Sequence, residues 1–310
     1  MEQTVWVSGA SSQLGVFLLP RLRDAGFRVL ALSRRAPQTP LTVADGVSWA
    51  RPDATAFADL AAVQGEPEFL VSCGPLDLAR RILDAAPHLR RVVAFSSSSV
   101  VSKADSPDPE EGARMAGMAR AETALTEACA RRSLPLLLLR PTLIYGCGLD
   151  SNVSLLAAFA RRFGVIPLAG KAGGLRQPVH ADDLAELALR SLMAAVPLDR
   201  VSPACGGSTL AYREMARRIA AALPRRARLL TLPAGLLAAL LPLASRLGGW
   251  WGLDIGLSAE MARRQNRNLA FDDTALRQAL AWSPRPFAPT AADFEIPARA
   301  RILQLPDPQL

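Results

Sequence analysis

Residues that mark metal sites and disulfide frameworks are scarce in this sequence. Four cysteines, at positions 73, 129, 147 and 205, lie far apart, and His88 and His180 are the two histidines. A metal site or a disulfide framework needs such residues in closely spaced sets. We therefore expect no metal and no disulfide, which fits a reducing cytoplasm. The chain also starts without the basic and apolar segments of a secretion signal, so a cytoplasmic protein is expected.

Lysine is also rare. Lys103 and Lys171 are the two lysines among 36 basic residues, so the net charge of +8 comes mainly from arginines scattered along the chain. Arginines spread in this way, in a chain rich in alanine and leucine, indicate a compositional bias rather than a nucleic-acid surface. We expect no nucleic acid partner. Hydrophobic residues make up 50% of the sequence, enough to bury one large core, or one core with a smaller lobe attached.

The first fifteen residues contain the most informative motif. A β-branched and aromatic run ends at Gly9, and apolar residues recur at helical spacing after Gln13. A strand, a tight glycine turn and a helix N-terminus present backbone N–H groups to an anion, most often a dinucleotide pyrophosphate. A second apolar run, over residues 28–32, closes a β-α-β unit. The residues assigned to this phosphate site are Gly9, Ser11, Ser12, Gln13, Leu14 and Gly15.

Apolar runs and helical patterns alternate through the first half of the chain. This alternation predicts an α/β fold, a doubly wound parallel sheet with ligands at the carboxyl ends of its strands. The predicted strands are 47–50, 69–72, 91–96, 136–140 and one near Val201, and the predicted helices are 77–86, 111–131, 183–195 and 212–223.

Four segments resemble motifs of the extended and atypical short-chain dehydrogenase/reductases, the NAD(P)-dependent epimerases and dehydratases. Residues 9–15 are similar to the loop G-x-x-G-x-x-G, and 139–146 to L-R-P-x-x-x-Y-G. Residues 176–185 are similar to R-x-x-V-H-V-x-D-D-A, and 271–285 to a C-terminal F-D motif that ends in W-x-P-R. The resemblance spans nearly the whole chain.

This resemblance implies a division of the chain into two parts. A Rossmann-like NAD(P)-binding domain is expected over residues 1–150. Residues 151–310 should form mainly a substrate-binding lobe, with 175–205 returning to the Rossmann core. We expect the proline-spaced tail from Pro286 onward to be peripheral.

Two positions bear on which dinucleotide binds and on how its phosphates are held. Ser12 replaces the middle glycine of the loop, so its hydroxyl either bonds the phosphate or holds the cofactor off; we favour the first interpretation. Arg34 and Arg35 follow the second strand, where an acidic residue would bond the ribose of NAD. Their charge favours NADP(H) over NAD(H), although both could equally be solvated turn residues.

Further cofactor contacts follow from the resemblance. Asp53 is the candidate for the adenine, although an aspartate that caps a helix near Ala56 would look the same. Small residues at a strand end let a ribose pack against backbone, and a proline of the family packs beside the nicotinamide. The residues assigned to these contacts are Cys73, Gly74, Pro75, Ser96, Ser97 and Pro141.

The residue pair that transfers protons in the family is missing. Its Tyr-x-x-x-Lys motif aligns with Arg114 and Met118, and neither side chain can replace it, because arginine stays protonated and methionine has no exchangeable proton. The two tyrosines, Tyr145 and Tyr212, lack a lysine four residues on. Ser98, third in a run of four serines, is expected to hold the substrate oxygen, unless the run is only a polar turn. Tyr145 is a candidate substitute acid.

The resemblance also implies substrate contacts. Asn152 is expected to meet the substrate, and Arg176 a nucleotide-sugar phosphate. For His180 we favour a structural role that joins the lobe to the sheet over a role as metal ligand. The full set assigned to the substrate is Ser99, Arg114, Met118, Asn152, Arg176 and His180.

Residues 232–251 form a strongly apolar run that Pro242, Arg246 and two glycines interrupt. It is too broken for a spanning helix; it could line a lipophilic substrate pocket, contact a membrane surface, enter a dimer interface or pack within the lobe.

The resemblance also implies a homodimer. We expect an oxidoreductase or epimerase acting on a carbonyl or hydroxyl substrate, such as a nucleotide sugar. The alternative is a non-catalytic NADP(H)-binding module associated with a partner or a membrane.

Overall fold

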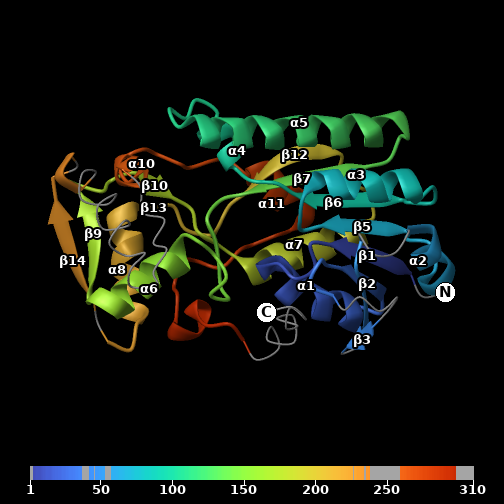
Figure 1. Ribbon diagram of the computed structural model, residues 1–310, viewed down its shortest axis with the longest axis horizontal. Coiled ribbons are helices and arrows are strands. Elements are labelled where there is room, and N and C mark those ends of the chain that lie inside the picture. Colours follow the sequence, from blue (N-terminus) through green and yellow to red (C-terminus); the bar gives the residue numbers. More distant parts are fainter. Residues whose placement is uncertain are drawn as a thin grey trace.

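A single eight-stranded sheet organises the described part of the protein (Figure 1). The computed structural model describes residues 3–36, 42–44, 46–52, 57–225, 227–233, 235–237 and 259–297. The strand order is β12-β7-β6-β5-β1-β2-β4-β3. These strands are β1 (Thr4–Ser8), β2 (Arg28–Leu32), β3 (Thr42–Ala44), β4 (Val47–Ala50), β5 (Phe69–Ser72), β6 (Arg91–Phe95), β7 (Leu136–Pro141) and β12 (Arg200–Ala204).

The pairing confirms the predicted doubly wound, Rossmann-like fold. Every neighbouring pair from β12 to β4 is parallel, and only β3 runs antiparallel to its neighbour in the described sheet. From β1 the chain passes first to β2 and later to β5 on the other side, so the strand order reverses between β1 and β5. Ligands of such sheets bind at this reversal, outside the carboxyl ends of the strands.

Helices cover both faces of the sheet because side chains alternate along each strand. In β1, Val5 and Val7 pack with α1 and α7, whereas Trp6 lies in the core on the opposite face, with α3 and α5. α3 and α5 therefore cover one face of the sheet, and α1 and α7 cover the other. The helices are α1 (Gln13–Asp24), α2 (Phe57–Gln64), α3 (Leu76–Ala85), α5 (Pro109–Arg131) and α7 (Ala181–Met193).

A smaller group of elements, with its own apolar core, lies beyond the carboxyl ends of the strands (Figure 1). Its main sheet pairs β9 and β14 in parallel, and α6 and α8 pack on it. The elements are α6 (Val153–Phe163), β9 (Val165–Ala169), β10 (Leu175–Arg176), β13 (Leu210–Ala211), α8 (Tyr212–Ala222), β14 (Arg228–Leu232) and α10 (Ala259–Arg264).

Short strands and the C-terminal segment fasten this group to the main sheet. β8 (Ile144–Tyr145) pairs with β11 (Val179–His180), and α7 follows directly. After α11 (Thr274–Leu280), the indole of Trp282 donates to the carbonyl of Asp183 at 3.0 Å. The chain then forms the 3-10 helix η2 (Ala291–Phe294).

The tail was expected to be peripheral from Pro286 onward, but its described part, residues 286–297, is not. Phe287 is fully buried and Phe294 nearly so, because both complete the core of the smaller group. Most of the apolar run 232–251 lies outside the described residues. Among the helices that are described, none combines the length and hydropathy needed to cross a bilayer.

Candidate functional site

The loops after β1 and β5 meet so closely that only glycine fits. Gly9 has φ +66°, and a Cβ atom on it would lie 2.5 Å from the backbone nitrogen of Gly74. A Cβ atom on Gly15 would lie 1.9 Å from the carbonyl oxygen of Ala10. The glycines therefore allow the loop to pass tightly from β1 into α1 beside the strand reversal.

The N-terminus of α1 opens at this reversal. Ser12 is the N-cap, and its hydroxyl accepts a long hydrogen bond of 3.5 Å from the N–H of Gly15. Among the described residues, the N–H groups of Gln13 and Leu14 have no hydrogen-bond partner. Unpaired N–H groups and the positive end of a helix dipole suit an anion. A dinucleotide pyrophosphate therefore fits this loop.

The end of β2 lies against the same loop. The hydroxyl of Ser33 donates to that of Ser11 at 2.7 Å, and Arg34 and Arg35 follow in an exposed turn. These arginines therefore lie where the ribose end of a dinucleotide would pass. Asp53, assigned to the adenine, lies outside the described residues. The role of Ser12 toward phosphate remains a prediction.

On the other side of the loop, Cys73 and Gly74 follow β5, and Pro75 precedes α3 as its N-cap. Burial raises the pKa of the Cys73 thiol to about 12. The side chain therefore stays uncharged near neutral pH and presents a small apolar surface beside Gly9.

A small cavity of about 240 Å³ lies beside the start of α1, at the carboxyl ends of β6 and β7. Two buried polar atoms there, Oε1 of Gln13 and Oγ of Ser96, have no hydrogen-bond partner. Buried polar atoms are normally paired, so unpaired ones suggest a missing ligand or water. A polar ring such as nicotinamide fits these groups. The lining residues are Gln13, Ser96, Ser97, Pro141, Thr142, Ile144 and Leu149 to Asn152.

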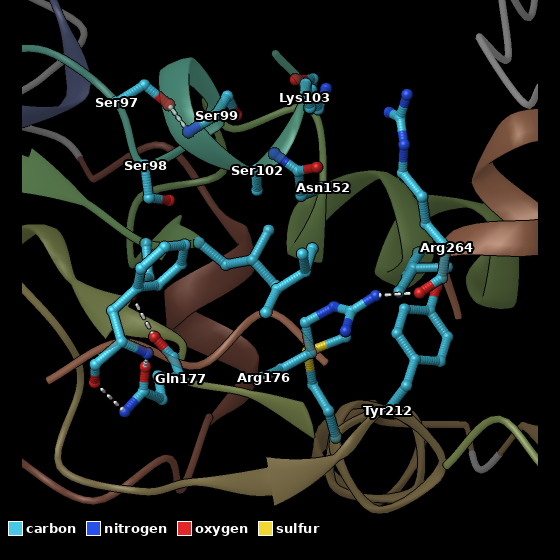
Figure 2. A pocket seen from close by; sticks show the side chains of 17 residues that line it. Ser97, Ser98, Ser99, Ser102, Lys103, Asn152, Arg176, Gln177, Tyr212 and Arg264 are labelled. Atoms are coloured by element: carbon cyan, nitrogen blue, oxygen red, sulfur yellow. Dashed lines mark hydrogen bonds between the residues drawn. The ribbon is translucent and has the colours of Figure 1, made fainter. Parts of the chain in front are cut away.

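A larger cavity of about 350 Å³ adjoins it, between the strand ends and the smaller group of elements (Figure 2). The two cavities share the lining residues Ser97, Thr142, Ser151 and Asn152. A molecule in the larger cavity would therefore lie next to a ring in the smaller one. Other lining residues are Ser98, Ser99, Ser102, Lys103, Arg176, Gln177, Tyr212 and Arg264.

Three cationic side chains line the larger cavity, and none of its described lining residues is acidic. Arg176 is only 4% exposed, and its guanidinium donates to the carbonyls of Leu175, Arg264 and Arg267. It also stacks over Tyr212, whose buried hydroxyl has no partner. Burial lowers the pKa of Arg176 to about 10. Because its partners are neutral, an anionic ligand would supply the missing counter-charge.

The other two cations share one carboxylate. Lys103 follows the short helix α4 (Ser99–Ser102), and its Nζ lies 2.9 Å from Oε1 of Glu111. Arg264 binds both carboxylate oxygens of Glu111, and the hydroxyl of Ser106 donates to Oε2 of Glu111 at 2.6 Å. Burial opposes ionisation of Glu111, but these hydrogen bonds outweigh it and lower its pKa to about 2.

The residues assigned to the substrate fall into two groups. Ser98, Ser99, Asn152 and Arg176 line the larger cavity. Asp150, rather than Asn152, caps α6 through the N–H of Ser154, so the amide of Asn152 faces the cavities.

The remaining assigned residues do not line either cavity. Arg114 is exposed on α5, and Met118 is half-buried there. His180 packs between Phe17 and Tyr145 and bonds Asp293, which is a structural setting. Tyr145 is 1% exposed, and burial raises the pKa of its phenol. Tyr145 packs against His180 and Phe287, and its role as a substitute acid stays a prediction that this burial does not favour.

Sequence reasoning missed Lys103, Tyr212 and Arg264. A faint signal existed for Lys103, one of two lysines and four residues after Ser99 on a helical pattern. None existed for Arg264, because it meets Glu111 across 153 residues.

Residues 5–199 match the profile of the NAD dependent epimerase/dehydratase family. No curated protein matches the chain significantly. MoeE5 in complex with UDP-glucuronic acid and NAD is similar in structure, with a TM-score of 0.63 at 19% identity, over 91% of this chain and 94% of MoeE5.

Two further solved structures have similar folds. The UDP-N-acetylglucosamine 4-epimerase from Bacillus cereus has a TM-score of 0.66 at 14% identity, over 98% of this chain and 96% of the epimerase. The terminal R domain from the myxalamid PKS-NRPS biosynthetic pathway has a TM-score of 0.71 at 18% identity, over 94% of this chain and 89% of that domain. At these identities the likeness concerns the fold.

Proposed function

Because the chain belongs to the NAD dependent epimerase/dehydratase family, we propose that it is an oxidoreductase or epimerase that uses NADP(H). Its substrate would be an anionic molecule with a reactive carbonyl or hydroxyl group, such as a nucleotide sugar.

The adjoining cavities are the observation that carries this proposal. Ser97 and Thr142, at the ends of β6 and β7, line both of them. A nicotinamide in the smaller cavity and a substrate in the larger one would meet at this shared wall. Hydride exchange requires such direct contact between the reacting carbons, and the bound dinucleotide would supply that chemistry.

The chain's own residues would bind and orient the substrate. Ser98 is directed into the larger cavity (Figure 2), where its hydroxyl can hold the substrate oxygen. The buried guanidinium of Arg176, whose partners are neutral carbonyls, favours a phosphate or carboxylate elsewhere on the substrate. The UDP-glucuronic acid held by MoeE5 is an anion of this kind.

The preference for NADP(H) rests on the turn after β2. Arg34 and Arg35 are both exposed there, and Ser33 stands where an acidic residue would bond the ribose of NAD. Two guanidinium groups attract a 2′-phosphate.

Fluorescence titration with NADPH and NADH, followed by turnover assays with UDP-glucuronic acid, UDP-glucose and a lipophilic ketone, tests the proposal. We expect tighter binding of NADPH, turnover of a UDP-sugar, and a loss of about 100-fold in kcat for Ser98→Ala. Ser283→Ala, at an exposed position, is the matched control. Failure to bind either dinucleotide would overturn the proposal.

A non-catalytic NADP(H)-binding module is the second candidate. The observation that favours it is the setting of Arg114 and Met118 on α5, since neither lines a cavity or can transfer a proton. Binding of NADPH without turnover of any substrate, together with association with liposomes, would support this module.

A further inference from the structure

One face of the short helix α4 forms a wall of the larger cavity. Ser99, Ser102 and Lys103 are three and four residues apart, so they lie on the same side of a helical turn, and all three line the cavity. The N–H of Lys103 donates to the carbonyl of Ser99 at 2.9 Å, which continues the turn through Lys103. Figure 2 shows Ser102 and Lys103 on this wall, with Asn152 nearby.

We infer that Lys103 donates and recovers the proton at the substrate's reacting oxygen, in place of a residue on α5. This inference rests on the proposed function, because it concerns the same cavity and the same reaction. Reduction of a carbonyl needs a proton as well as a hydride, so an acid must lie within reach of the oxygen.

The other cavity residues are poorly suited to this task. Arg176 donates to three backbone carbonyls and Arg264 binds both carboxylate oxygens of Glu111, so both guanidinium groups are committed to partners within the protein. Tyr212 is a phenol, but it is buried beneath Arg176, and burial raises its pKa to about 12. Among the described lining residues of this cavity, Lys103 is the only primary amine.

Glu111 accepts a hydrogen bond from the ammonium of Lys103 but does not use all of its N–H donors. An ammonium has three N–H donors, and one bonds Oε1 of Glu111 at 2.9 Å. Arg264 and Ser106 fix the same carboxylate independently. The lysine is therefore oriented by a rigid partner, while other N–H groups remain for a substrate oxygen.

The proposed step balances. A bound dinucleotide would supply a hydride to the carbonyl carbon, and the π electrons would move to the oxygen. That oxygen takes a proton from Nζ, which leaves an alcohol and a neutral amine at Lys103. Water then returns a proton to the amine, and oxidation of an alcohol follows the same path in reverse.

Labelling with pyridoxal 5′-phosphate tests the inference without any turnover assay. This probe carries an aldehyde and a phosphate, and it forms an imine only with an amine that has given up its proton. Borohydride fixes the imine, and peptide mass spectrometry distinguishes Lys103 from the exposed Lys171. We expect Lys103 to be labelled faster than Lys171, with a rate that saturates with probe. Labelling of Lys103 no faster than Lys171 would overturn the inference.

Kinetics supply the second arm if a UDP-sugar is turned over. We expect Lys103→Arg, which keeps the charge, to lower kcat about 100-fold with little change in KM and to alter the pH profile of kcat. Lys171→Arg should change neither. A normal kcat for Lys103→Arg would overturn the inference while the proposed function stands. Absence of turnover in the unaltered protein would instead count against the proposed function, and labelling would still decide the reactivity of Lys103.

Discussion

Nε2 of His180 lies 3.1 Å from Oδ1 of Asp293, although 113 residues separate the two in the sequence. Nδ1 of the same ring accepts the N–H of Asp182 at 3.0 Å, so Nε2 carries the proton and donates to Asp293. The carbonyl of Asp293 also accepts the N–H of Gly148. The C-terminal segment is thereby tied to β11 and to the loop that leads into both cavities.

Replacement of Asp293 tests this tie. Asp293→Ala leaves the Nε2–H of His180 buried without an acceptor, so the free energy of unfolding should fall by about 1 to 3 kcal/mol. Asp293→Asn keeps an acceptor and is the matched control, with a smaller loss. Urea denaturation measures both. Equal stability of the alanine variant and the unaltered protein would show that the hydrogen bond contributes nothing.

Replacement of Ser12 decides between its two interpretations. The hydroxyl caps α1 only through a 3.5 Å hydrogen bond, so Ser12→Gly should cost a few tenths of a kcal/mol in stability. If the hydroxyl bonds a phosphate, as we expect, the variant binds NADPH more weakly in a fluorescence titration. Tighter binding would mean that Ser12 holds the cofactor off. Gly9 is less suitable for this test, because any side chain there meets the backbone of Gly74.

Replacement of both Arg34 and Arg35 by alanine tests the preference for NADP(H). We expect the affinity for NADPH to fall at least about tenfold, the equivalent of one lost charge-assisted contact, with little change for NADH. Arg120→Ala, at an exposed position on α5, controls for the loss of positive charge. A parallel loss for both dinucleotides would contradict the assignment of the arginines to a 2′-phosphate.

Glu111 should make stability depend on pH in the acid range. Its pKa falls from 4.5 to about 2 in the folded protein, so folding favours the carboxylate. This stabilisation is complete above pH 4.5 and is lost as the pH falls toward 2. Glu111→Gln should lower the free energy of unfolding at pH 7 by roughly 2 to 3 kcal/mol and flatten the acid decline. Urea denaturation from pH 3 to 7 measures both effects, and an unchanged decline would contradict this role.

The sequence by itself determined the fold class and the tight turn between β1 and α1. Short apolar runs bounded by glycine and polar residues predicted β1, β2 and β5, since strands buried on both faces need continuous apolar residues. The glycine spacing from Gly9 to Gly15 predicted the tight turn, and Gly15 does meet the backbone of nearby Ala10. Such features depend on residues close in the sequence, so the sequence alone reveals them, whereas the contact of Gly9 with Gly74 involves a distant segment.

Only the tertiary structure decided which side chains share the larger cavity. Arg264 and Lys103 meet at Glu111 from separate elements, whereas Tyr145, within a family motif, is turned into the core against Phe287. The sequence pattern predicts which face of a helix or strand is buried, but it does not predict which residue of a distant segment packs against that face. Burial and hydrogen bonding between such segments therefore fix the chemistry of the site, because they set which groups reach the cavity and which charges remain there to be balanced.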